Sequence, residues 1–161
     1  MTPTSLSKND DEAQLAVLRR ALARRHHLFG WICLLIFLSF GGVLEALNAF
    51  KIGAYLDLAH KVRREMWTLA HAHGTLLALM HVGFAASVST IGHWTAARLR
   101  LASFLLLDAA VLIPLGFFLG GVGHSEGDPS TPILLVPLGA LALFVGVGLV
   151  VHSAWRTNHR A

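Results

Sequence analysis

Residues 28–44 read LFGWICLLIFLSFGGVL and contain no Asp, Glu, Lys or Arg. The apolar run continues to residue 50 with Glu45 as its single charged residue. This length matches the roughly 20 residues that a helix needs to cross a hydrocarbon core. We therefore predict a first membrane span at about residues 27–50.

Three more segments have the same character, at about residues 66–91, 101–122 and 132–155. The first and third of these carry no formal charge, and the second is interrupted only by Asp108. Only 14% of the whole chain is charged, against about 25% in an ordinary soluble domain. Four spans with short connections predict an all-α, polytopic membrane protein: an up-down-up-down bundle over residues 26–156, followed by a short tail at 157–161.

Residues 1–25 form a polar leader before the first span. Acidic residues stand where a helix would begin, and Leu15, Leu18 and Leu22 then recur at helical spacing beside four arginines. The pattern predicts a short basic amphipathic helix. Two interpretations stay open: a helix lying on the inner leaflet, or a solvated helical leader.

The basic residues predict the orientation. Nine of the 13 lysines and arginines fall on the side of the termini, and the other four lie in the loop after the first span. The positive-inside rule then places both termini in the cytoplasm of a cell with the chain in its inner or plasma membrane. Because the positive residues lie mainly at segment ends, the lipid bilayer is the expected partner, and nucleic acid is not.

Several kinds of site are excluded by the sequence. The single cysteine, Cys33, rules out an intrachain disulfide and a multi-cysteine metal site. No nucleophile elbow, phosphate loop or His-Glu-x-x-His helix occurs, so no recognisable catalytic motif indicates a reaction. A membrane isomerase or hydrolase that uses Glu45 and a histidine as acid and base is therefore less favoured than a binding, transport or structural function.

Ionisable residues inside the spans are the candidate functional residues, because their burial in lipid is costly. At a rise of about 1.5 Å per residue, Glu45, His71 and His73 fall in an outer layer, with Glu45 and His71 both about 10 Å from the span centres. Two imidazoles and a carboxylate are the ligand types of a transition-metal site for Fe, Cu or Zn. His124 in the last outer loop could cover the same end.

The spacing of the two histidines limits this hypothesis. Residues two apart on a helix are turned by about 200°, so His71 and His73 cannot both bind one ion in a regular helix. We expect one of them to face Glu45 and the other to face a different neighbour. A buried polar clasp, in which the histidines bond to Glu45 and to backbone, is the alternative.

A second, inner layer contains His81 and Asp108. We predict that they pair, because each would relieve the desolvation of the other, either as a structural contact or as a step in a proton relay. Five further histidines near span ends are expected at the cytoplasmic interface: His26, His27, His93, His152 and His159.

Residues 69–79, LAHAHGTLLAL, resemble the second helix of the catalytic subunit of haem-copper oxidases, where His-Gly-Thr supplies an axial ligand to the low-spin haem. Small haem-binding relatives also begin a membrane helix with His-x-His. The resemblance covers about a dozen of the 161 residues and implies haem b with His73 as its ligand. A second axial ligand would have to come from His124 or another subunit, or the iron would be five-coordinate.

Three functions therefore stay open. The first is a haem- or metal-binding subunit for electron transfer or sensing. The second is a small proton-coupled carrier or a lipid- or quinone-binding protein, with the polar residues lining a path. The third is a structural subunit of a homo-oligomer or larger membrane complex. Whether the protein is an enzyme is not decided by the sequence.

Overall fold

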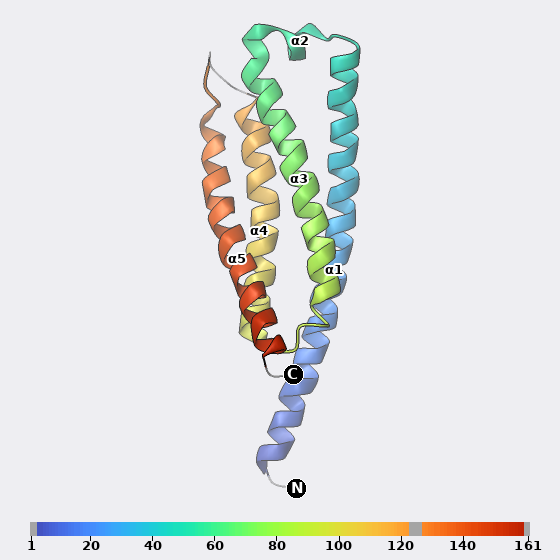
Figure 1. Cartoon of the computed structure of the whole chain (residues 1–161), viewed down its shortest axis with the longest axis vertical. Helices are drawn as coiled ribbons and strands as arrows, with labels where there is room; N and C mark the ends of the chain where they lie inside the picture. The colour runs from blue at the N-terminus through green and yellow to red at the C-terminus, as the bar shows by residue number, and fades with distance from the viewer. Residues whose placement is uncertain (1–2, 123–126, 160–161) are drawn as a thin grey trace.

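The computed structural model describes residues 3–122 and 127–159, and four long helices dominate it (Figure 1). These are α1 (Pro3–Ala49), α3 (Lys61–Ser87), α4 (Ala96–Gly120) and α5 (Leu135–Asn158). Short helical segments α2 (Gly53–Leu56) and η1 (Leu58–His60) precede α3, and η2 (Thr131–Leu134) leads into α5. Each long helix contains a segment long and apolar enough to cross a membrane, which confirms four span-like helices.

The helices alternate in direction and lie in a row in the order α1, α3, α4, α5 (Figure 1). Each packs mainly on its neighbour in this row, and among the described residues no Cα of α1 lies within 8 Å of a Cα of α5. The arrangement is therefore an open, up-down-up-down row. The start of α1 and the end of α5 lie at one end, which we call the terminal end, and the opposite end is the α2 end (Figure 1).

The leader and the first span form one continuous helix, α1, of 47 residues. The expected short N-terminal helix is thus not a separate element. Its apolar stripe of Leu15, Leu18 and Leu22 packs on the core cluster at the terminal end, around Phe84 and Leu99. The first turns of α1 project beyond this end of the row (Figure 1).

Local sequence explains where two of the helices begin or end. Thr95 caps α4, because its side-chain oxygen accepts a hydrogen bond from the Arg98 backbone N–H at 3.3 Å. After α1, the Ile52 N–H reaches back to the Leu47 carbonyl, and Lys51 adopts a left-handed φ of 51°. This is the Schellman arrangement, with lysine at the position that glycine usually occupies.

The row is tighter at the terminal end than at the α2 end. The larger core cluster lies near the terminal end and consists of Phe84, Val88, Ile91, Trp94, Leu99, Ala102 and Leu106. Towards the α2 end, α1 and α3 diverge (Figure 1). This divergence leaves a cavity between the end of α1 and the beginning of α3.

Candidate functional site

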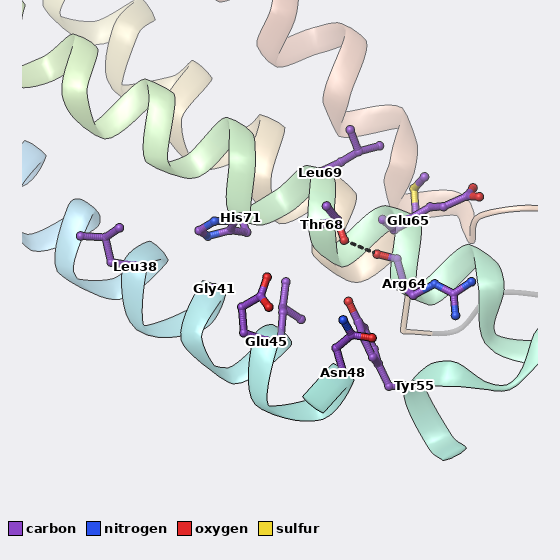
Figure 2. A pocket seen from close by; sticks show the side chains of 12 residues that line it. Leu38, Gly41, Glu45, Asn48, Tyr55, Arg64, Glu65, Thr68, Leu69 and His71 are labelled. Atoms are coloured by element: carbon purple, nitrogen blue, oxygen red, sulfur yellow. Dashed lines mark hydrogen bonds between the residues drawn. The ribbon is translucent and has the colours of Figure 1, made fainter. Parts of the chain in front are cut away.

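The cavity between α1 and α3 has a volume of about 870 Å³, within the usual range for small-molecule sites. Glu45 and His71 both line it, from α1 and α3 respectively (Figure 2). The rest of its wall mixes apolar and polar side chains: Leu38, Leu44, Asn48, Tyr55, Arg64, Glu65, Met66, Thr68 and Leu69. Glu45 and one of the two outer-layer histidines therefore line the same cavity.

The orientation of His71 is set by the backbone of α1. Its Nδ1–H donates a hydrogen bond to the Phe37 carbonyl oxygen at 2.8 Å, since a carbonyl can only accept. Gly41 makes room for the ring, because a Cβ there would overlap His71 Cε1 and lie 2.8 Å from Nδ1. With the proton fixed on Nδ1, neutral His71 carries a lone pair on Nε2 that can accept a hydrogen bond or bind a metal.

Glu45 supplies a second acceptor on this cavity. Its side chain is exposed, and no described cation forms a salt bridge with it. Arg64, which also lines the cavity, turns towards α2, where its Nη1 donates to the Leu56 carbonyl at 3.1 Å (Figure 2). The carboxylate is thus left for a ligand or a further partner.

His73 faces a different neighbour, as its spacing from His71 predicts. Its Nδ1–H donates to the Leu69 carbonyl one turn earlier, at 2.9 Å. Its ring packs on Phe117 of α4, with 4.9 Å between ring centroids. The two histidines therefore do not converge on one ion.

The residues that the structure describes do not bring the predicted metal ligands together. No group of three or more His, Cys, Asp or Glu residues there could hold a metal ion. His124 lies outside the described residues, so its relation to Glu45 is not part of this geometry. Haem binding by His73 stays a prediction.

The prediction that His81 pairs with Asp108 is wrong. His81 instead forms a hydrogen bond with His26, with 2.6 Å between the two Nδ1 atoms. Asp108 is half-buried and has no hydrogen bond or ion pair with any described residue. The physical reason is that His26 of α1 already fills the position beside His81 between α1 and α3.

His26 was also expected at the water interface, and it is fully buried. Its other ring nitrogen, Nε2, lies 2.8 Å from Ser103 Oγ of α4. The arginines just before His26 led to the prediction that the span begins after residue 25, which placed His26 at the interface. The continuous α1 helix carries His26 into the core, while the adjacent His27 stays exposed.

Three side chains from three helices thus form one buried cluster, the His26–His81–Ser103 cluster. Their exposed fractions are 0%, 0% and 2%. Phe29 and Phe84 pack edge-on against its rings. Sequence reasoning missed this cluster because a serine in an apolar helix carries no signal of its partner.

Comparison with known proteins gives no match: no family model, no curated protein and no solved structure is significantly similar to the chain.

Proposed function

We propose that the chain is a multi-pass protein of an inner or plasma membrane that binds an amphipathic molecule of the quinol class in the cavity between α1 and α3. The α2 end would face outwards, with both termini in the cytoplasm. The excess of basic residues on the terminal side supports this orientation, as does the common end shared by the start of α1 and the end of α5.

The observation that carries the proposal is the pair of acceptors on one cavity. His71 has its proton on the nitrogen bonded to Phe37, so its Nε2 accepts, and the Glu45 carboxylate also accepts. A ligand that satisfies both must present hydrogen-bond donors. A quinol has two hydroxyl groups for this purpose, and its apolar ring and tail suit the leucines of the wall.

A second candidate is a metal or haem iron bound through His71 alone. A backbone carbonyl on Nδ1 is the usual support for a metal-binding imidazole, and His71 has one in Phe37. His73 has a similar bond to Leu69, but Phe117 packs on its ring. Of the two histidines, His71 therefore fits such a group better, and Lewis-acid or redox chemistry would be supplied by the metal.

The test compares the two redox forms of a short-chain benzoquinone on purified protein. Binding is followed by tryptophan fluorescence, since Trp67 stacks on the cavity residue Tyr55 with 6.4 Å between the ring centroids. Quinol should bind more tightly than quinone, which lacks donors. Glu45→Ala removes this acceptor and should weaken quinol binding about 10- to 150-fold, from about 1.5–3 kcal/mol for a hydrogen bond to a charged group.

The matched control is His73→Gln, which changes a histidine on the other face of the same helix. It should leave quinol affinity unchanged, whereas His71→Gln should weaken binding. Equal affinity for quinol and quinone, or equal effects of the two histidine variants, would reject the proposal. Stoichiometric iron in the purified protein that is lost in His71→Gln would favour the metal candidate.

A further inference from the structure

Asp108 is the central residue of the 25-residue helix α4. At a rise of about 1.5 Å per residue, each end of the helix lies about 18 Å away along its axis. With α4 crossing the membrane as proposed above, the carboxyl group lies near the middle of a hydrocarbon core about 30 Å thick. Ionisable groups at this depth are rare, and they usually pair with another group or mark a path or a binding site.

This carboxyl group has no partner in the part of the chain that the structure describes. Asp108 is half-buried and forms no hydrogen bond or ion pair there. Its neighbours on the same side of α4 are Phe104, Val111 and Leu115, which are all exposed and apolar. A second copy of the chain would not supply a cation at this depth, because residues 26–50, 65–97 and 101–155 contain no lysine or arginine. A cation that pairs with Asp108 must therefore belong to a different molecule.

An apolar groove lies between α1 and α4, where both flank Ala70 of α3. Its volume is about 420 Å³, within the usual range for small-molecule sites. None of its described lining residues is charged, and four of them are phenylalanines, so we call it the aromatic groove: Phe29, Phe37, Phe40 and Phe118. It shares no lining residue with the cavity between α1 and α3, so the two are separate sites.

The aromatic groove and Asp108 occupy neighbouring parts of one surface of α4. Val111, which lines the groove, comes three positions after Asp108, so it is turned by about 60° and lies about 4.5 Å further along the axis. Leu115, which also lines the groove, comes seven positions after Asp108 and is turned by only about 20°. Phe40 and Phe118 meet edge-on, with 5.6 Å between ring centroids, at the end of the groove nearer the α2 end. Asp108 therefore lies towards the other end of the groove.

These two features together favour one kind of ligand. An apolar chain would fill the groove but would leave the carboxylate unpaired. A small hydrated cation would pair with the carboxylate but would lose its water shell and leave the groove empty. A cation with bulky apolar substituents satisfies both, and aromatic rings also attract positive charge.

We propose that the aromatic groove and Asp108 bind a lipophilic organic cation. Its apolar groups lie among the phenylalanine side chains, and its charge lies beside the carboxylate.

The test is equilibrium binding of radiolabelled tetraphenylphosphonium, a lipophilic cation, to the full-length protein in detergent, with protein-free micelles as the blank. Binding should saturate. Asp108→Asn keeps the shape of the side chain and removes its charge, so affinity should fall about tenfold or more. Asp108→Glu restores the charge and should restore most of the affinity. Triphenylphosphine oxide, a neutral compound with similar rings, should compete poorly.

Matched variants test each half of the site. Glu45→Gln neutralises a carboxylate of another span and should leave cation binding unchanged. Val111→Trp fills the groove and should weaken binding, whereas Leu101→Trp adds the same ring at an exposed position of α4 outside the groove and should not. Circular dichroism confirms that each variant is folded.

Four results would overturn the proposal: a wild type that does not bind the cation saturably, an Asp108→Asn variant that binds it as tightly, equal effects of the two tryptophan variants, or a loss confined to Glu45→Gln. The first would leave Asp108 for a basic transmembrane helix of another protein, and the last would place the cation in the cavity between α1 and α3. Asp108→Asn should bind quinol like the wild type, so the aromatic groove and the proposed function succeed or fail separately.

Discussion

Replacing Gly41 by alanine should separate the packing of His71 from general effects on α1. The added Cβ would overlap His71 Cε1 and lie 2.8 and 2.9 Å from the two ring nitrogens. His71 must then leave the Phe37 carbonyl, or the two helices must move apart. Gly42, the next residue, is the matched control, because a Cβ there meets nothing within 4 Å.

The magnitude follows from three contributions. Overpacking costs about 1–3 kcal/mol, and the lost hydrogen bond costs about 1 kcal/mol. The gain in helix propensity from glycine to alanine, about 1 kcal/mol, applies to both variants and cancels in their comparison. Gly41→Ala should therefore be about 2–4 kcal/mol less stable than Gly42→Ala.

Thermal unfolding in detergent, followed by circular dichroism, measures this difference. At about 2–4 °C per kcal/mol for a chain of this size, the two melting temperatures should differ by about 4–16 °C. Gly41→Ala should also weaken quinol binding, because His71 leaves its position on the cavity. Equal melting temperatures for the two variants would refute the close packing of His71 on Gly41.

Three further outcomes are expected in the same unfolding assay. Ser103→Ala should destabilise by about 1–3 kcal/mol, because it leaves a buried ring nitrogen without its partner, whereas Ser153→Ala should be nearly neutral. Gly74→Ala should destabilise by about 1–3 kcal/mol, because its Cβ would overlap the Phe37 ring; an unchanged melting temperature would contradict this contact. Lys51→Gly should stabilise by up to about 1 kcal/mol, because it relieves the left-handed φ of 51°, and a loss of stability would show that the lysine side chain contributes more than the strain.

The sequence predicted the helices well because their signal is composition. A membrane span needs a long apolar run with few charges whatever helices surround it. All four predicted runs form helices. The boundary before the first span was not predictable in the same way. Polar and basic residues up to Arg25 look like a separate leader, yet helical hydrogen bonding continues through them into α1.

The candidate site was predictable to the extent that it depends on one helix. The 200° turn between His71 and His73 correctly separated them, because that rule needs no partner. The neighbour of His81 was not predicted, since the arginines before His26 placed that histidine at the interface and left Asp108 as the residue at the depth of His81. The contact depends on how α1 packs against α3, where Gly41 and Gly74 leave room for the rings of His71 and Phe37.

The row of helices also has a consequence for synthesis at the membrane. α3 packs on α1, α4 on α3 and α5 on α4, so each long helix meets a surface that is already present when it emerges. The hydrogen bond between His26 and Ser103 joins α1 to α4, which are not neighbours in the row, across 77 positions of the chain. A nascent chain that ends before α4 would leave His26 without this partner, so the arrival of the third long helix completes the polar interior.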